Sequence, residues 1–292
     1  MKLRPRTNRS LHLLPFFAAF LSIAAASSCY AGAWTEPQGE FYEKVSYNYY
    51  YAHQDFDSAS NRVATPNGGK FTDLDVNNYI EYGLTNDLTV INSLTYKWLR
   101  NDFNGGAATS GSGLGDVDLG LRYKLLDKSA GIVSTQFLVK IPGVYGVNDS
   151  LPLGNGQYDA ELRLLYGRSL YPHLPGYMNL EIGFRWRAGA PSDEVRYLAE
   201  FGDDLTSKLF VRAKLDGILS VKNGASVAGS NVISPNTNPT ATNNYNLGKL
   251  DLALGYKITP SFGVELSYRP DIYGWNTAAG ANYSLALYYK SF

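Results

Sequence analysis

The sequence predicts an all-β chain that closes into an antiparallel transmembrane β-barrel of about 12 strands, after a cleaved signal peptide. Three observations predict this fold: charged and apolar residues alternate, short turns alternate with long loops, and the chain begins with an export leader. A β-strand points successive side chains to opposite faces, so an alternating segment has one apolar and one charged face. Barrels of the outer membrane turn the apolar face to lipid and the charged face to the lumen.

Residues 1–33 have the layout of a secretory signal peptide. The basic region contains Lys2, Arg4, Arg6 and Arg9. An apolar stretch follows over residues 11–26, and Ala31-Gly32-Ala33 gives a cleavage site before Trp34. This stretch is short for a transmembrane helix, and no later apolar run is long enough to be one. We therefore expect a signal peptide over 1–33 and a barrel over 34–292, placed in the cell outer membrane.

Cys29 is the only cysteine of the chain and leaves two interpretations open. It could be the acylated first residue of a lipoprotein, although Ala26-Ser27-Ser28 lacks the leucine usual three positions upstream. The preferred interpretation is that Cys29 leaves with the signal peptide. The barrel then contains no thiol, and its stability must come from the sheet.

The composition narrows the expected partners. Lys and Arg total 26, and Asp and Glu total 26, so the formal net charge is zero. The chain therefore carries no excess of positive charge that would attract nucleic acid. Tyrosine occurs 23 times, and its amphipathic ring suits a membrane–water interface. We expect outer-membrane lipid and, during biogenesis, the barrel-assembly machinery as partners, and no cofactor.

Twelve alternating segments are expected as strands. They run near 40–53, 72–84, 88–100, 114–126, 131–141, 158–169, 176–188, 194–202, 208–221, 247–258, 262–270 and 281–291. Tight turns are expected at 85–87, 127–130, 203–207 and 259–261, and long loops near 54–71, 101–113, 142–157, 222–246 and 271–280. The connections at 171–175 and 189–193 fit this alternation less well. Short turns are typical of the periplasmic end of such barrels and long loops of the extracellular end.

In these segments nearly all charged residues occupy alternate positions, called here one phase, whose side chains point to the same face of the sheet. Over 116–125, the residues Asp116, Asp118, Arg122 and Lys124 alternate with Val117, Leu119, Leu121, Tyr123 and Leu125. An exception is Glu43, which we place at headgroup level. A charge turned to lipid costs about 2–4 kcal/mol for Arg or Lys, so turning the whole set outward would exceed any net folding stability. The charges are therefore predicted to face the lumen.

The aromatic residues divide between the two phases. Tyr47, Tyr49, Tyr51, Tyr96, Trp98, Trp186 and Tyr268 fall on the outward phase, where we expect an interfacial girdle rather than the alternative, a track on which sugars stack. Tyr50, Tyr79, Tyr177 and Tyr288 fall on the inward phase, where they could contact a permeant.

The lumen is the candidate functional site. Solute contact is expected from the basic residues Arg163, Arg185, Arg187, Arg212 and Lys214 and from the acidic residues Asp159, Glu161, Glu181 and Asp216. Mixed charges are typical of a polar channel that selects small solutes, although ion pairs could also fill the interior and leave no pore. Because the first strand begins soon after the cleavage site, no long N-terminal segment is available as a plug.

Enzymatic and metal sites have little support. His53 and His173 are the only histidines after the leader, and neither has an evident serine partner for hydrolysis. With no cysteine and no histidine cluster in the barrel, no metal site is expected. The glycines of 113–115 and 154–156 are not followed by a helix, so they are not phosphate loops. Loop 222–246 could be a solvated surface loop, a gate that folds inward or an adhesive tip.

Five stretches carry a resemblance to a known family. They are Gly32-Ala33-Trp34-Thr35, residues 113–120, residues 153–157 with Asp159, residues 189–194 and residues 276–280. Through them the chain resembles Gram-negative outer-membrane transporters associated by name with the meta-cleavage pathway of phenol degradation. The resemblance spans nearly the whole barrel and implies a transporter without a catalytic signature. Phe292 is one step out of phase with Leu285 and Leu287, so a bulge near 290–291 is expected.

We therefore predict a passive channel for small solutes, with aromatic acids or sugars as candidates, and no enzyme. The alternative is a closed structural barrel that presents extracellular loops for adhesion or serves as the partner of a polysaccharide-secretion system.

Overall fold

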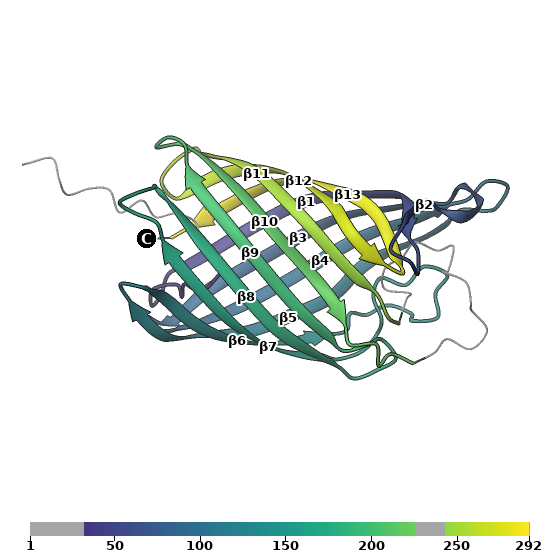
Figure 1. Ribbon diagram of the computed structural model, residues 1–292, viewed down its shortest axis with the longest axis horizontal. Helices are drawn as coiled ribbons and strands as arrows, with labels where there is room; N and C mark the ends of the chain where they lie inside the picture. Colours follow the sequence, from purple (N-terminus) through teal and green to yellow (C-terminus); the bar gives the residue numbers. More distant parts are fainter. Residues whose placement is uncertain (1–31, 226–242, 292) are drawn as a thin grey trace, which may run out of the picture.

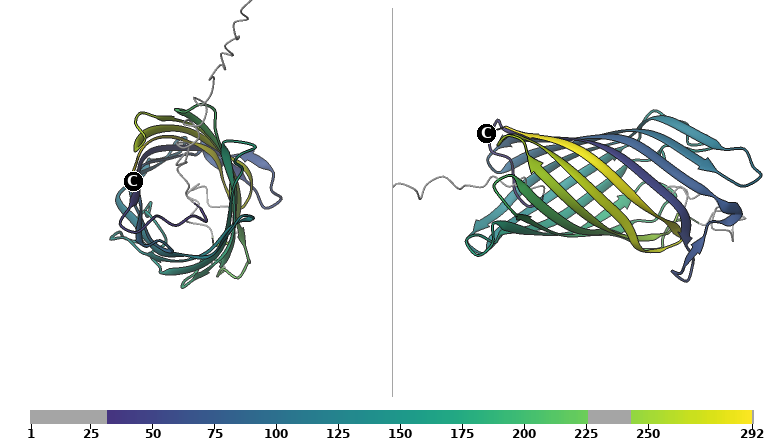
Figure 2. Two further views of the ribbon diagram at one scale, coloured as in Figure 1. Left: turned by 90° about the vertical axis from the view of Figure 1, so that its left-hand side faces the viewer. Right: turned by 90° about the horizontal axis from the view of Figure 1, so that it is seen from above.

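The computed structural model describes residues 32–225 and 243–291, which form one closed antiparallel sheet (Figures 1 and 2). The strands are β1 (Phe41–Phe56), β2 (Arg62–Ala64), β3 (Lys70–Thr85), β4 (Leu88–Asp102), β5 (Thr109–Lys128), β6 (Gly131–Ile141), β7 (Asp159–Ser169), β8 (Gly176–Arg187), β9 (Glu194–Asp204), β10 (Leu209–Ser220), β11 (Asn246–Lys257), β12 (Phe262–Trp275) and β13 (Thr277–Lys290). A 3-10 turn, η1, covers Pro66–Gly68. Among the described residues no helix is long and apolar enough to cross a membrane.

Closure of the barrel follows from the pairing of its first and last strands. Every long strand pairs with its neighbours in sequence, and β13 returns to pair with β1 from Tyr42↔Lys290 to Phe56↔Thr277. The short strand β2 adds only to the end of β1 and lies outside the ring. A closed sheet satisfies its backbone groups without an exposed edge, as a membrane-spanning sheet must.

The two ends of the barrel differ. At one end, here called the turn end, lie the start of β1, the end of β13 and the short turns such as 86–87 and 129–130 (Figure 1). At the opposite end, here called the loop end, lie the longer connections 57–69 and 142–158 and the described ends, 221–225 and 243–245, of the connection from β10 to β11. The predicted separation of short turns from long loops is confirmed for the described residues.

The burial pattern is the reverse of that of a soluble protein. Glu81, Glu161 and Glu194 are almost fully buried, while outward-phase residues such as Ile182 and Leu266 are each 58% exposed. The side chains of the charged phase meet inside the barrel in ion pairs, as the alternation predicts. Glu43 stays on the outward phase, where it accepts a hydrogen bond of 2.7 Å from Asn78 Nδ2.

The twelve predicted strands are confirmed, but the expected loop at 271–280 is wrong. β12 continues to Trp275 and β13 begins at Thr277, so the reversal uses Asn276 alone, with a φ of 53°. Pro270 suggests a strand end, but it lies beside a shift of register at Gly248/Lys249, and proline is tolerated near such irregularities. Strand β2 and turn η1 within loop 54–71 were also not expected.

The last strand keeps its register to its end. Its pairing with β1 runs without a bulge from Ala281 to Lys290, and Ser291 continues by donating its backbone N–H to the carbonyl of Phe41. The bulge expected at Lys290 is therefore absent. The phase of Phe292 itself lies outside the described residues, as do the signal peptide up to residue 31, Cys29 and the centre of loop 222–246.

A substitution at Leu266 tests whether the apolar face of the sheet contacts lipid. Replacing Leu266 with arginine is expected to lower the free energy of unfolding by about 2–4 kcal/mol in lipid vesicles, because the new charge faces hydrocarbon. Urea titration of folded protein measures the change, with Leu205→Arg in a turn as the control. An unchanged urea midpoint for Leu266→Arg would contradict a lipid-facing position.

Candidate permeation lumen

One wall of the lumen is a network of ion pairs across β7, β8 and β9. Its centre is the fully buried Glu161, which pairs with Arg163, with Arg185 Nε at 2.6 Å and with Arg196 Nη1 at 3.3 Å. Neighbouring strands in register place these side chains opposite one another, since Glu161 faces Arg185 in the β7–β8 ladder. The charges of this wall therefore largely neutralise one another.

The same wall continues toward the loop end around Asp159. Its Oδ2 lies 3.3 Å from Lys140 Nζ and 3.3 Å from Arg187 Nε. Arg187 Nη1 in turn lies 3.0 Å from Glu194 Oε1. These pairs leave little of either charge free for a solute.

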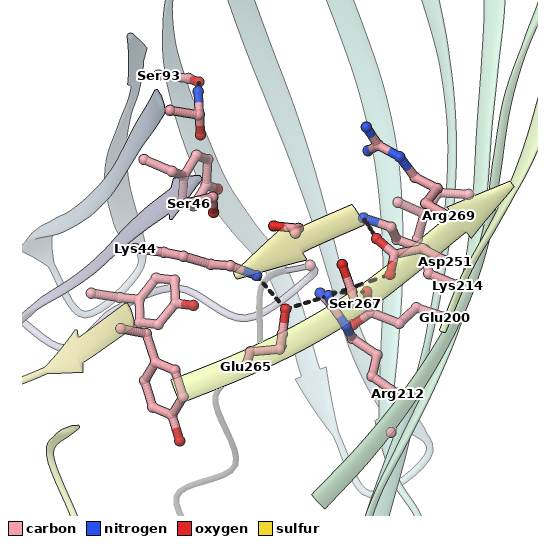
Figure 3. A pocket seen from close by; sticks show the side chains of 18 of the residues that line it. Lys44, Ser46, Ser93, Glu200, Arg212, Lys214, Asp251, Glu265, Ser267 and Arg269 are labelled. Carbon is pink, nitrogen blue, oxygen red and sulfur yellow. Dashed lines mark hydrogen bonds and ion pairs between the residues drawn. The ribbon is translucent and has the colours of Figure 1, made fainter. Parts of the chain in front are cut away.

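A second network lies on β10, β11 and β12 (Figure 3). Arg212 Nη2 lies 2.8 Å from Glu265 Oε1, and Lys44 Nζ reaches the same oxygen from β1 at 2.5 Å. Asp251 pairs more loosely, at 3.7 Å with Lys214 and at 3.9 Å with Arg212. The looser pairs make this wall more available to a solute than the β7–β9 wall.

The segment 32–40 lies inside the turn end, along the inner wall from β3 to β8. The backbone N–H of Ala33 donates to Asn179 Oδ1 at 3.1 Å, and Arg122 Nη1 donates to the carbonyl of Trp34 at 2.9 Å. Ser134 Oγ donates to the carbonyl of Ala33, and Ala33 is fully buried. A short segment thus narrows this mouth, although the sequence predicts no long plug.

Glu36 ties this segment to the last strand. Its Oε2 lies 3.5 Å from Lys290 Nζ, and its backbone N–H donates to Thr89 Oγ1 at 2.8 Å. Burial raises the pKa of Glu36, and the nearby Lys290 opposes that effect only in part. Glu36 therefore takes up a proton more readily than a carboxyl group in water. Because the protonated side chain remains compatible with burial, mild acid should not release segment 32–40 from the lumen.

The loop between β6 and β7 folds into the loop end. Leu151 and Leu153 of this loop pack with Phe71 and Leu99, which are inward residues of β3 and β4. Tyr145 of the same loop donates a hydrogen bond to Asp116 Oδ1. Among the described residues this loop narrows the outer mouth, whereas the sequence suggested that loop 222–246 could do so.

Two adjoining cavities occupy the lumen. The larger, of about 530 Å³, extends from Gly32 at the turn end to the middle of the barrel. The smaller, of about 240 Å³, lies between Tyr50, Phe71 and Leu247 toward the loop end. Both are lined by Asp75, Lys97, Arg269 and Asn282, so they adjoin at that level.

Four of the nine predicted solute-contact residues line a cavity, and the other five do not. Arg163, Glu181, Arg212 and Lys214 line the larger cavity. Arg185, Arg187, Asp159 and Glu161 are held in the wall network, and Asp216 has a buried Oδ1 without a hydrogen-bond partner among the described residues. The four tyrosines named from the sequence as inward all line a cavity: Tyr79, Tyr177 and Tyr288 the larger and Tyr50 the smaller.

Sequence reasoning placed Lys249 and Arg269 on the inward phase without selecting them. Within the described residues neither makes an ion pair, and both are half-buried beside the smaller cavity. Figure 3 shows the Arg269 guanidinium with no dashed line to a neighbour. Only the complete set of ion pairs in the lumen distinguishes Lys249 and Arg269 from the cations that carboxylates already neutralise. The alternation of charged and apolar residues therefore could not identify them.

The two histidines of the described residues lie at opposite ends of the barrel. His53 stacks on Tyr51 with ring centroids 5.5 Å apart, near the loop end of β1, and His173 lies in the β7–β8 turn. In the part of the chain that the structure describes, no group of three or more His, Cys, Asp or Glu is placed to hold a metal ion.

A closed antiparallel sheet with a charged lumen and an apolar exterior defines the class of outer-membrane β-barrels. An outer membrane channel from Pseudomonas putida F1 has a similar structure, with a TM-score of 0.68 and 17% sequence identity over 89% of this chain and 98% of that one. The NanC porin is similar with a TM-score of 0.51 and 11% identity, over 85% and 100% of the two chains.

The same fold serves a different task in a third protein. The translocator domain of the autotransporter NalP from Neisseria meningitidis has a TM-score of 0.50 and 13% identity, over 88% of this chain and 90% of that one. No protein-family model matches the sequence. No curated protein matches it either. At these identities the similarity establishes the fold, and the function must be argued from the lumen.

Proposed function

We propose that this protein is a passive channel of the outer membrane for small solutes and has no catalytic role. The observation that carries the proposal is the pair of adjoining polar cavities inside a closed barrel. Outer-membrane lipid contacts the apolar exterior, and the barrel-assembly machinery inserts the chain after removal of residues 1–33. The names of two structurally similar proteins, a channel and a porin, support the same class.

Aromatic acids and sugars are the proposed solutes. The larger cavity combines the phenol rings of Tyr177 and Tyr288 with the charged groups of Arg163, Arg212 and Lys214. Such a lining can contact a ring face and a polar substituent together. An association with the meta-cleavage pathway of phenol degradation fits aromatic acids and rests on the family resemblance alone.

Single-channel recording tests the proposal. The protein, purified from outer membranes and inserted in a planar bilayer, should give discrete conductance steps that scale with salt concentration. Folding of the barrel is verified separately by the slower migration of the heat-denatured protein during electrophoresis. Silence from protein that is folded and inserted would contradict an open channel.

A closed structural barrel is the second candidate, and a specific observation favours it. Segment 32–40 narrows the turn end and loop 142–158 narrows the loop end. A barrel closed at both ends could present its loops for adhesion or to a polysaccharide-secretion partner. Silence in the conductance measurement, combined with binding of cells or of a secretion component, would support this candidate.

Arg212 and Lys214 should influence ion selectivity. Exchanging both for glutamine removes two positive charges from the larger cavity and leaves Glu265 and Asp251 less neutralised. We expect the reversal potential in a salt gradient to shift toward cation selectivity. The same exchange at Arg185 and Arg187, which lie in the wall network, should produce a smaller shift.

Lys128, the last residue of β5, serves as the control for this measurement, since Lys128→Gln changes the charge outside the two cavities. Lys214→Gln alone is the milder variant, because the only ion pair of Lys214 among the described residues is 3.7 Å long. Unchanged selectivity in the double variant would exclude these two residues as solute contacts.

A further inference from the structure

The smaller cavity has an apolar wall. Phe71, Leu99, Leu153 and Leu247 line it, and all four are buried. Three of them come from strands, while Leu153 comes from the inward-folded loop between β6 and β7. An engineered apolar cavity of ~150 Å³ is enough to admit benzene, so about 240 Å³ has room for a small ring with a substituent.

Two cations face this apolar wall. Lys249 of β11 and Arg269 of β12 line the same cavity, and neither has a carboxylate within ion-pairing distance in the described ranges. Other lumen cations, such as Arg185 and Arg212, are each held by two or more carboxylates. Lys249 also faces Asp216 in the β10–β11 ladder without forming an ion pair with it. A partly buried cation without a close ion pair is unfavourable, and an anionic ligand would reduce that cost.

The three carboxylates around the cavity are already engaged. Asp73 Oδ2 lies 3.5 Å from Lys97 Nζ, and Asp75 Oδ1 accepts a hydrogen bond of 2.8 Å from Asn48. Asp271 Oδ2 accepts hydrogen bonds from the Tyr50 hydroxyl at 2.7 Å and from the backbone N–H of Gly280 at 2.9 Å. Asp271 faces Lys249 in the β11–β12 ladder without forming an ion pair with it.

From this arrangement we infer that the smaller cavity is a binding site for a small amphipathic carboxylate. The hydrocarbon part of the solute packs against Phe71, Leu99 and Leu153, and its carboxylate binds Lys249 and Arg269. This inference rests on the proposed channel function and makes it more specific, since it favours aromatic or aliphatic acids over sugars. Arg269 also lines the larger cavity, so it is placed to pass the carboxylate between the two cavities.

Calorimetric titration of the purified protein in detergent tests the site with three probes. Benzoate carries a ring and a negative charge, acetate the charge without the ring, and benzylamine the ring with a positive charge. We expect benzoate to bind more tightly than either of the others. Exchanging Lys249 and Arg269 for glutamine should weaken benzoate binding by about tenfold or more, because charge-assisted hydrogen bonds are lost.

Matched controls separate the site from general effects. Lys257→Gln removes a lumen cation at the turn end, where Asp204 neutralises it, and should leave benzoate binding unchanged. Leu153→Ala lies in a loop, so it tests the apolar wall with little risk to barrel assembly. It should weaken benzoate binding and leave acetate binding as it is.

The outcomes distinguish this inference from the channel proposal. Equal binding of benzoate and benzylamine, or full benzoate binding by the Lys249/Arg269 variant, would overturn the carboxylate site even if the channel conducts. Benzoate binding that depends on both cations, in a barrel that gives no conductance, would uphold the site and reject the channel.

Discussion

Replacing Glu161 with alanine is expected to lower the free energy of unfolding of the barrel by about 3–5 kcal/mol. Glu161 is fully buried and forms ion pairs with Arg163, Arg185 and Arg196. Removing it leaves three guanidinium groups near one another with fewer counter-charges. Urea unfolding in lipid vesicles, followed by tryptophan fluorescence, measures the loss.

Two further variants show whether charge or packing causes the loss. Glu161→Gln keeps the shape and one acceptor oxygen, so it should lie between the wild type and the alanine variant. Glu40→Ala, before the first strand, is the control for loss of a carboxylate and should stay within about 0.5 kcal/mol of the wild type. A wild-type urea midpoint for Glu161→Ala would mean that the network contributes little to stability.

Loosening the segment inside the turn end is expected to increase current through the barrel. Ser134→Ala combined with Asn179→Ala removes both side-chain hydrogen bonds to Ala33 and leaves the leader unchanged. Each bond contributes about 1 kcal/mol, so the ratio of released to seated segment should rise roughly tenfold or more. Single-channel recordings should then show longer open periods.

A nearby change provides the control for this result. Thr35→Ala removes a hydrogen bond to the carbonyl of Asn86 in the β3–β4 turn and leaves the contacts with Ser134, Arg122 and Asn179 in place. Its open periods should match those of the wild type. If the double variant also matches the wild type, segment 32–40 does not limit conduction.

The strands were predictable because lipid and lumen impose opposite requirements on alternate residues. Successive residues of a strand point to opposite faces, so the charged Glu161 is expected inward and the apolar Leu162 outward from the sequence alone. The same rule applies along each long strand. The rule gives less information where side chains are small. Residues 276–280 contain no charge to set a phase, so the early start of β13 was missed.

The contents of the lumen were less predictable. Alternation showed that Arg187, Arg212 and Arg269 face inward, but pairing depends on strands far apart in sequence. Lys44 and Glu265, for example, meet across 221 residues. Likewise the positions of Ala33 and Leu153 inside the barrel depend on contacts with several strands at once.

The sequence by itself determined the class of fold, the number of long strands and the inward direction of the charges, because these follow from a local period of two residues and the cost of placing charge in lipid. Only the tertiary structure decided which charges neutralise one another, which segments narrow the mouths and which cations remain for a solute. Those outcomes depend on the closure of β13 onto β1, which fixes every distance across the lumen.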